Sequence, residues 1–301
     1  PNRGPVAGGI TLRVTGAGFG ALGATQVSVG GVPMSLVSVT PTEIVGLLPP
    51  GAGAGAVDVA VKSDGVTRVL TNGFRYVGAS TGVAQGTWST GPELPEPVSE
   101  ASAAAVGNDV YVLGGVGGGR DVHVFDAVLS RWRAGTPLPP SFPGSDHVNV
   151  ASVGGRLYVM GGLAPPSAAV HVYDPVTDRW TERGPILRGG APFPLGASAV
   201  AVLGTDVYLI GGLQDEQAPT GVSLVYDTLA DTWREIPAMP VSLNHAAGVG
   251  ALGKVWVIGG RPGIDQPHAG SDAVQVFDPA TSSWDRTTYR LPVARAAMGP
   301  A

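Results

Sequence analysis

The chain has 301 residues, of which 14% are charged, and its net charge at pH 7 is −5. This sparse charge, without a basic block, lacks the electrostatic footprint of a nucleic-acid-binding protein. Cysteine is absent, which excludes disulfides and thiolate metal sites, and no apolar run approaches the roughly 18 residues of a membrane span. The 47 glycines and 27 prolines, among many alternating valine-rich segments, predict an all-β chain of short strands and tight turns.

Residues 1–78 read as a series of short strands with turns rich in glycine and proline between them. The strand segments are ITLRVT, QVSVGG, LVSVT, EIVGLLP, AVDVAVKS and FRYV. Their spacing of about ten residues and their polar–apolar alternation predict a small β-sandwich.

A glycine-rich stretch in this region matches the dinucleotide-binding pattern G-x-G-x-x-G, from Gly18 to Gly23. That pattern binds a pyrophosphate only where its last glycine opens a helix, because the helix N-terminus holds the anion. Here Gly23 is followed by alternating Val27 and Val29 and then by a Gly-Gly turn, which predicts a strand. The stretch is therefore interpreted as structural and not as a nucleotide site.

The series Gly4-Pro5, Gly8-Gly9, TGAGFG, VGGVP, LPPG and FRYV resembles the IPT/TIG immunoglobulin-like domain. The resemblance implies that Gly16, Gly18 and Gly20 form a bend where a positive φ is required, and that Phe19 fills the core between two sheets. The domain is expected to cover 1–78, followed by a flexible linker over 79–86.

From residue 88 onward one block recurs four times at a period of 47 to 50 residues. Each block has an apolar strand that ends in Gly-Gly, a strand that ends in an aromatic residue and Asp, and a Trp seven residues after that aromatic. The glycines are Gly114, Gly115, Gly161, Gly162, Gly211, Gly212, Gly259 and Gly260, and the tryptophans are Trp132, Trp180, Trp233 and Trp284. This period with four short strands per unit predicts propeller blades.

The block resembles the Kelch repeat, which implies a Kelch β-propeller over 87–301 with four complete blades and parts of a fifth. TWSTGPELP at 87–95 resembles the fourth strand of a blade, and LPVARAAMGPA at 291–301 resembles the start of a fifth blade's first strand. Closed Kelch rings usually have six or seven blades, so the chain is expected to be a fragment of a longer protein. The twelve repeated glycines and tryptophans are interpreted as structural.

The lengths of the connections predict which face of the propeller binds. The connections that follow the fourth and second strands of a blade vary in length, whereas the other two hardly vary. In an antiparallel blade these two variable connections lie on one face, and loops on a rigid scaffold commonly carry function. The alternative is that surface loops drift in length at little energetic cost.

Polar residues on this face are the candidate binding residues. Glu100, His147, Ala197 and His245 stand fourteen residues before each glycine pair and are expected to ring the mouth of the central channel. The long loops and the last repeat add further candidates, which are Asp215, Glu216, Arg261, Asp265, His268 and Arg295. Kelch proteins often carry Arg two residues before the ring position, and only Arg295 keeps it here.

No catalytic residue, metal site or cofactor is predicted. His123 and His171 occupy equivalent third-strand positions in separate blades, with no recurring carboxylate beside them, so they do not indicate a metal site. The copper oxidases among Kelch propellers need a Cys cross-linked to a Tyr, and this chain has no Cys.

Two classes of function remain open. The preferred one is a non-catalytic protein that binds a protein or glycan, outside the cell or at its surface, in a bacterium as the Ala-, Gly-, Val- and Arg-rich composition suggests. The alternative is a carbohydrate-active enzyme similar to the sialic-acid mutarotases, with Glu100 or His245 as acid or base.

Overall fold

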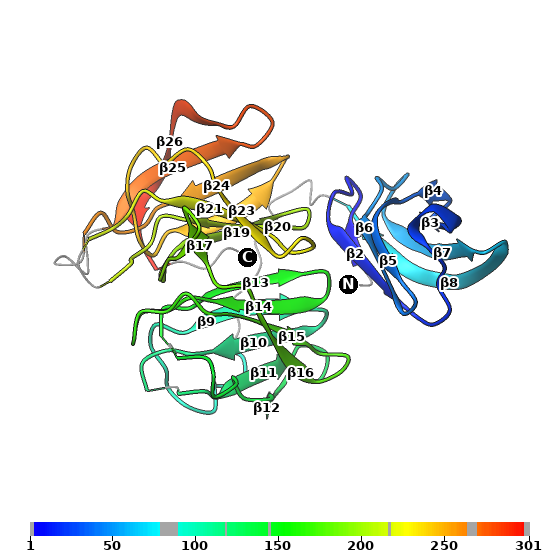
Figure 1. Cartoon of the computed structure of the whole chain (residues 1–301), viewed down its shortest axis with the longest axis horizontal. Helices are drawn as coiled ribbons and strands as arrows, with labels where there is room; N and C mark the ends of the chain where they lie inside the picture. The colour runs from blue at the N-terminus through cyan, green and yellow to red at the C-terminus, as the bar shows by residue number, and fades with distance from the viewer. Residues whose placement is uncertain are drawn as a thin grey trace. The chain divides into compact units, whose positions relative to one another are not determined.

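The computed structural model describes residues 3–78, 90–117, 119–143, 146–215, 218–263 and 270–297. Two compact units, Pro1–Gly91 and Pro92–Ala301, divide the chain. Both are built from short strands, as Figure 1 shows. Over the described residues no helix is long and apolar enough to cross a membrane.

Two sheets bury a common core in the first unit. The larger sheet has the strand order β1 (Arg3–Pro5), β8 (Val66–Val77), β7 (Gly55–Ser63), β3 (Thr25–Val29) and β4 (Val32–Pro33). The smaller sheet has the order β2 (Thr11–Thr15), β6 (Glu43–Leu47) and β5 (Ser35–Thr40). Leu12 and Ile44 of the smaller sheet pack in one cluster with Val29 and Phe74 of the larger sheet. The all-β, immunoglobulin-like prediction for this unit is confirmed.

The glycine-rich stretch opens no long helix, in agreement with the structural interpretation of these glycines. A three-residue 3-10 turn, η1 (Leu22–Ala24), leads directly into β3. Gly18 has a φ of +75°, as expected, whereas the positive-φ prediction for Gly16 and Gly20 is wrong. At these two positions a Cβ would instead crowd a side chain, because it would lie 2.5 Å from the Phe19 ring and 2.6 Å from the Asp64 carboxylate.

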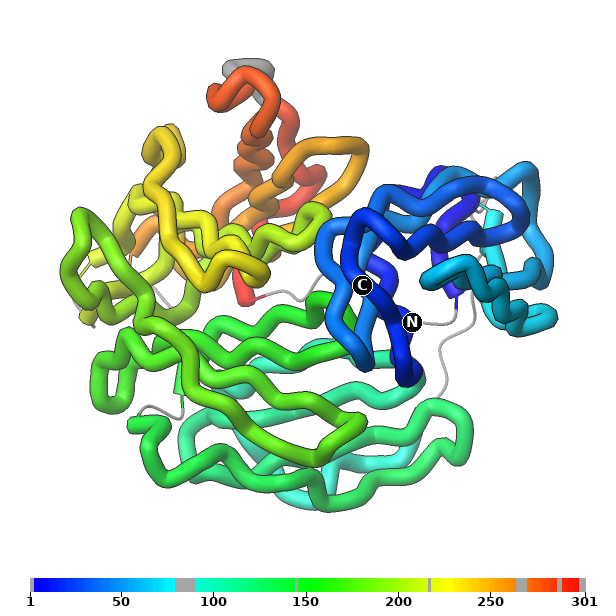
Figure 2. The backbone as a smooth tube through the Cα atoms, turned by 45° about the vertical axis from the view of Figure 1, so that its right-hand side comes forward, coloured from blue at the N-terminus to red at the C-terminus, as the bar shows by residue number. Residues whose placement is uncertain are grey.

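Four four-stranded antiparallel sheets form the second unit, one for each predicted blade. They consist of β9 (Ser102–Val106), β10 (Asp109–Leu113), β11 (Val122–Asp126) and β12 (Arg131–Ala134); β13 (Asn149–Val153), β14 (Arg156–Met160), β15 (Val170–Asp174) and β16 (Arg179–Arg183); β19 (Ala199–Leu203), β20 (Asp206–Ile210), β21 (Ser223–Asp227) and β22 (Thr232–Glu235); β23 (Ala247–Ala251), β24 (Lys254–Ile258), β25 (Ser271–Asp278) and β26 (Ser283–Arg295). We call them the first to fourth blades, and the tube of Figure 2 follows them in chain order.

Three details differ from the predicted repeat. A small hairpin of β17 (Leu187–Arg188) and β18 (Ala191–Pro192) lies in the connection between the second and third blades. Strand β26 continues through Arg295, still paired with β25 at Ser271, so residues 291–295 do not start a separate first strand. The predicted orphan strand at 87–95 lies partly outside the described residues, and its described part, 90–95, is not a strand.

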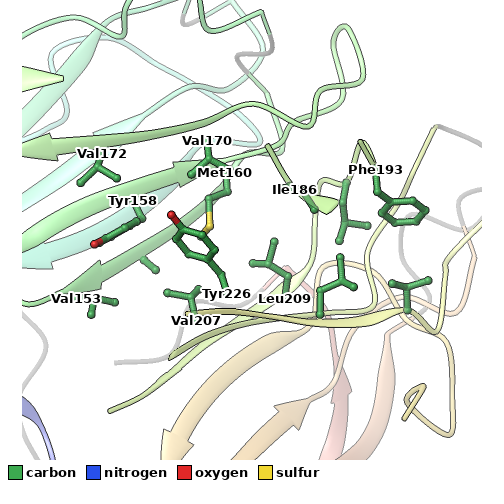
Figure 3. Close-up of a cluster of buried hydrophobic side chains, with 14 residues drawn as sticks. Val153, Tyr158, Met160, Val170, Val172, Ile186, Phe193, Val207, Leu209 and Tyr226 are labelled. Atoms are coloured by element: carbon green, nitrogen blue, oxygen red, sulfur yellow. The ribbon is translucent and has the colours of Figure 1, made fainter. Parts of the chain in front are cut away.

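Apolar side chains fill the space between neighbouring blades. Figure 3 shows the cluster between the second and third blades, where Met160 and Val170 face Leu209 and Tyr226. Equivalent clusters lie on both sides of it, between the first and second and between the third and fourth blades. Each blade is therefore buried against its neighbour, as repeat architectures require.

The repeated residues have the structural roles that the sequence predicts. All eight glycines of the four pairs have positive φ, from +61° to +130°, a conformation that disfavours residues with a Cβ. Each blade also pairs its third-strand aromatic with its Trp directly across strands three and four, with ring centroids 4.8–5.3 Å apart. The pairs are Phe125–Trp132, Tyr173–Trp180, Tyr226–Trp233 and Phe277–Trp284.

Candidate functional site

The four predicted ring positions share one unusual backbone conformation. Glu100, His147, Ala197 and His245 all have φ between +50° and +54°, and Ala297, which follows β26, has a φ of +52°. Non-glycine residues rarely adopt this left-handed conformation, and such residues cluster at functional sites. The conformation turns the chain sharply just before each innermost strand.

Backbone hydrogen bonds connect these positions from blade to blade. The N–H groups of Ala197 and His245 donate to the carbonyl oxygens of His147 and Ala197, both at 2.9 Å. The His147 N–H donates to the Glu100 carbonyl at 3.3 Å, and the Ala297 N–H donates to that of His245 at 2.9 Å. This chain of bonds fixes the spacing between positions that lie about fifty residues apart in the sequence.

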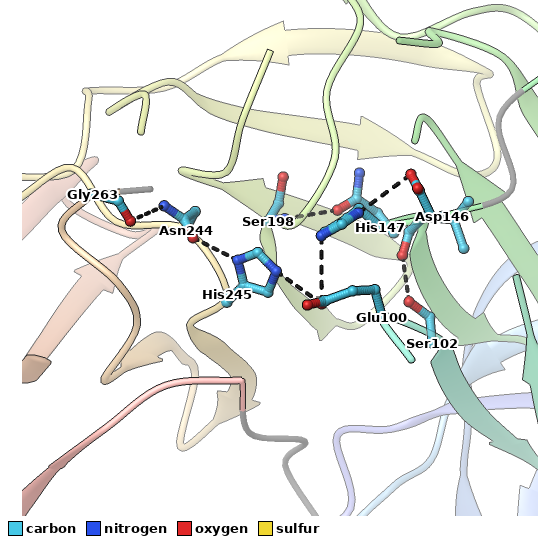
Figure 4. Close-up of polar contacts among 10 residues, drawn as sticks. Glu100, Ser102, Asp146, His147, Ser198, Asn244, His245 and Gly263 are labelled. Atoms are coloured by element: carbon cyan, nitrogen blue, oxygen red, sulfur yellow. Dashed lines mark hydrogen bonds and ion pairs between the residues drawn. The ribbon is translucent and has the colours of Figure 1, made fainter. Parts of the chain in front are cut away.

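Three polar side chains of the ring meet, and we call Glu100, His147 and His245 the mouth cluster. The Oε2 atom of Glu100 lies 3.1 Å from Nε2 of His245 and 3.4 Å from Nε2 of His147. The two imidazole rings stand edge to face, with centroids 5.0 Å apart. Figure 4 shows both rings directed at the same carboxylate.

A second layer of oxygen atoms holds each histidine ring from behind. Nδ1 of His147 lies 3.3 Å from Oδ1 of Asp146, and Nδ1 of His245 lies 2.5 Å from Oδ1 of Asn244. In both cases the partner is the residue immediately before the histidine. Each ring therefore has an oxygen atom beside both of its nitrogens, the preceding residue at Nδ1 and Glu100 at Nε2.

The mouth cluster is partly accessible. The side chain of Glu100 is 31% exposed, whereas those of His147 and His245 are 17% and 10% exposed. Burial, and next to it the positive charge of Arg261, lower the pKa of His245, while Glu100 acts in the opposite direction. His245 is therefore mainly neutral at pH 7 and can accept a proton.

A cavity of about 690 Å³ extends from the mouth cluster along the innermost strands of all four blades. Its wall consists mostly of small or apolar residues of β9, β13, β19 and β23, such as Ala103, Val150, Val200 and Gly248. A cavity lined mainly by small or apolar side chains, with a few convergent polar groups at one end, is the usual form of a ligand site. The cluster therefore marks the polar end of the cavity.

The other candidate residues are not gathered in the cluster. Asp215 is exposed in its loop, and Arg295 is exposed at the end of β26. Arg261 is partly buried, and its backbone is paired with that of Asn244 beside His245. Glu216, Asp265 and His268 lie outside the described residues.

His171 and His123 are separate from the mouth. His171 is 1% exposed, and its Nε2 lies 3.0 Å from Oγ of Ser141, in the connection that leaves the first blade. Its ring packs edge to face on Phe142, and burial lowers its pKa. His123 lies on β11 and is half-buried. His171 thus packs against the connection that leaves the first blade.

Sequence reasoning did not identify Asp146 and Asn244 as parts of the site. The available signal was their position, since each stands immediately before a ring histidine. Short side chains with an oxygen at that position reach the Nδ1 of the next residue once the backbone turns with positive φ.

Comparisons with known proteins agree with the repeat architecture. Residues 100–298 match the family model described as the KLHDC2/KLHL20/DRC7 Kelch-repeats domain, and residues 1–76 match the IPT/TIG domain model. The solved structure of YjhT superposes with a TM-score of 0.59 at 15% identity, covering 82% of this chain and 85% of YjhT, which shows a shared fold.

Among curated proteins, Kelch-like protein 35 of Mus musculus is 30% identical over 183 residues, a match that covers 59% of this chain and 29% of that protein. Kelch repeat and BTB domain-containing protein 12 of Homo sapiens is 28% identical over 211 residues, covering 60% of this chain and 33% of that protein. The chain thus spans less than half the length of these relatives. It belongs to the Kelch-repeat family and carries an N-terminal IPT/TIG domain.

Proposed function

We propose that the propeller is a non-catalytic binding module that holds a protein or glycan ligand on the face where the mouth cluster opens. The Kelch-repeat fold itself points to a binding or protein-interaction role. The proposal about the face rests on one observation, the convergence of Glu100, His147 and His245 at the end of the cavity that adjoins the glycine pairs and the variable loops.

The chemistry of the mouth suits a ligand that presents hydroxyl or amine groups. The Glu100 carboxylate accepts hydrogen bonds from such groups, and the small residues of the cavity wall leave room behind them. A sugar ring and a protruding polar side chain both offer this combination of donors and carbon surface. The ligand would dock on the loops and insert one group into the mouth.

We also propose that the protein acts outside a cell or at its surface, because an immunoglobulin-like module next to a propeller suits the presentation of a binding face. Cleavage of the protein by an added protease in intact producing cells tests this location. Complete protection in intact cells, with cleavage after lysis, would contradict it.

The binding proposal is tested with the purified full chain on a glycan array and against a displayed peptide library. Ligands selected by the wild type are measured again with Glu100→Gln, and with Leu252→Ala as the control. Leu252 is 90% exposed in the β23–β24 turn, at the opposite end of the innermost strands. We expect Glu100→Gln to weaken the selected ligands and Leu252→Ala to leave them unchanged. Equal binding by all three proteins would show that the mouth cluster does not take part in ligand binding.

A carbohydrate-active epimerase is the second candidate function, and one contact favours it. Glu100 and His245 lie within hydrogen-bonding distance, and the lowered pKa of His245 leaves its ring neutral and able to act as a base near pH 7. Exchange of sialic-acid anomers, followed by NMR with and without the protein, tests this candidate. Acceleration that is lost in both Glu100→Gln and His245→Gln would support it.

A further inference from the structure

We propose that the mouth cluster is a binding site for one divalent transition-metal ion, of which zinc is the reference, with Glu100, His147 and His245 as its ligands. This inference goes beyond ligand binding by the propeller and does not depend on it. One donor atom from each of the three side chains lies within 4.8 Å of the other two.

The distances between the donor atoms fit a metal ion. In a tetrahedral site with metal–ligand bonds of about 2.0–2.1 Å, neighbouring ligand atoms lie about 3.3 Å apart. Nε2 of His245 and Nε2 of His147 lie 3.1 and 3.4 Å from Oε2 of Glu100. Two of the three distances between donor atoms therefore match those of a metal site.

The hydrogen-bonding pattern leaves a position for a cation. Oxygen atoms of Asp146, Asn244 and Glu100 face both nitrogens of the two rings, and a neutral imidazole carries only one proton, so one nitrogen of each ring presents a lone pair to an oxygen. Such an arrangement of lone pairs is repulsive unless a proton or a cation lies among them. A metal ion satisfies all three groups at once, whereas one proton joins only two of them.

The residues behind the ligands match the outer layer of known metal sites. Ligating histidines commonly donate their second ring nitrogen to a carboxylate or another oxygen, which orients the ring and strengthens the ligand. Asp146 and Asn244 occupy these places for His147 and His245. Arg261 near His245 adds a positive charge that opposes the ion, whereas the carboxylates of Glu100 and Asp146 favour it.

The donor set indicates the class of ion. Two imidazoles and one carboxylate favour zinc and its first-row neighbours, whereas magnesium and calcium prefer oxygen ligands. Three protein ligands leave at least one coordination position, which would face the cavity and could take water or a ligand group. This is the arrangement of an open site, which differs from a closed structural one.

Because the three ligands come from the first, second and fourth blades, the ion would connect blades that are distant in the sequence. The ring of backbone hydrogen bonds already holds these positions in place, so the site is formed before the ion arrives. An ion that binds only the folded chain raises its stability.

The experiment uses the full chain, stripped with a chelator and titrated with zinc chloride by calorimetry, with bound metal counted by mass spectrometry. We expect one zinc ion per chain, a rise in the melting temperature with zinc, and no competition from magnesium. Cobalt, added in place of zinc, should give visible absorption bands characteristic of four or five nitrogen and oxygen ligands.

Variants assign the ion to the mouth cluster. His147→Ala and His245→Ala should each abolish the stoichiometric site, and Asp146→Asn should weaken zinc binding by about 10- to 100-fold, as for other outer-layer partners. His123→Ala, a half-buried histidine on β11, is the matched control and should bind as the wild type does. Glu100→Gln keeps the shape of the side chain, so loss of zinc binding in this variant cannot be attributed to misfolding. Failure of the wild type to bind zinc, or retention of the ion by both His147→Ala and His245→Ala, would overturn the proposal.

Discussion

The hydroxyl of Tyr226 donates a 2.6 Å hydrogen bond to Oδ1 of Asp231, five residues further along the chain. Tyr173 and Asp178 form the same bond, also at 2.6 Å, in the second blade. In the first and fourth blades the aromatic is Phe125 or Phe277, and the residue five positions later is serine. Tyrosine thus occurs with aspartate and phenylalanine with serine, so the two positions change together between blades.

This pairing predicts the effect of exchanging one blade's pair for another's. Tyr226→Phe should lower the free energy of unfolding by about 1–2 kcal/mol, because it removes a hydrogen bond to a charged acceptor that is partly buried. The double variant Tyr226→Phe/Asp231→Ser, which copies the first and fourth blades, should recover most of that loss. Urea denaturation of the wild type, both single variants and the double variant measures the coupling. Additive effects of the two substitutions would contradict the pairing.

Trp180 should contribute to stability through its packing on Tyr173. The ring centroids lie 5.0 Å apart, and Nε1 of Trp180 donates to the carbonyl of Thr136 at 3.1 Å. Because Trp180 is partly exposed, Trp180→Ala should cost about 3 kcal/mol, at the lower end for a large aromatic. Val176→Ala is the control, since Val176 is 70% exposed, and should cost less than about 0.5 kcal/mol. Similar unfolding midpoints for the two variants would show that Trp180 is not packed as described.

Gly161→Ala should be far more damaging than Gly189→Ala. Both glycines have positive φ, +70° and +59°, and a left-handed alanine alone costs about 1–2 kcal/mol. At Gly161 a Cβ would also collide with the carbonyl oxygen of Leu195 in the neighbouring blade, whereas nothing lies within 4 Å at Gly189. Thermal unfolding of both variants should show a clearly larger loss for Gly161→Ala. Equal losses would mean that the backbone around Gly161 moves away from the Leu195 carbonyl without a cost in stability.

The stability of the propeller should decrease as the pH falls below about 6.5, and His171 should be one cause. Burial lowers the pKa of His171 in the folded chain below its ordinary value of 6.5, with Glu182 acting in the opposite direction. The unfolded chain therefore binds a proton first, so the stabilisation present above pH 6.5 is lost as the pH falls toward the folded pKa. The variant His171→Gln copies Gln275 of the fourth blade and should reduce this pH dependence. Denaturant unfolding at pH 7.5, 6.5 and 5.5 measures how the free energy of unfolding depends on pH. The same dependence in the wild type and in His171→Gln would exclude His171 as its cause.

Much of the fold could be predicted from the sequence because the repeat constrains the backbone in the same way four times. The spacing of fourteen residues before each glycine pair located Glu100, His147 and His245 at one height in the propeller, although they lie far apart in the chain. The convergence of the two histidine rings on the Glu100 carboxylate could not be predicted, since it depends on the side-chain rotamers and on Asp146 and Asn244 behind the rings.

Other features depend on contacts that no repeat encodes. Gly16 lies against the ring of Phe19, three residues later in the chain, and Gly20 lies against the carboxylate of Asp64 from another strand connection, so a positive φ does not explain either glycine. The hairpin of β17 and β18 and the extension of β26 both lie where the repeat lengths diverge. In such segments the sequence periodicity ends, and local pairing decides the path of the chain.

Three blades contribute side chains to one shared polar site, and the ring-nitrogen NMR signals of the five histidines test this arrangement. With the metal-free chain, Glu100→Gln should shift the ¹⁵N signals of both His147 and His245 and leave those of His123 and His171 in place. Glu182→Gln, the matched control, should affect His171 alone, through the charge that acts on its ring. If Glu100→Gln leaves the signals of His147 and His245 unchanged, the mouth cluster does not exist as described.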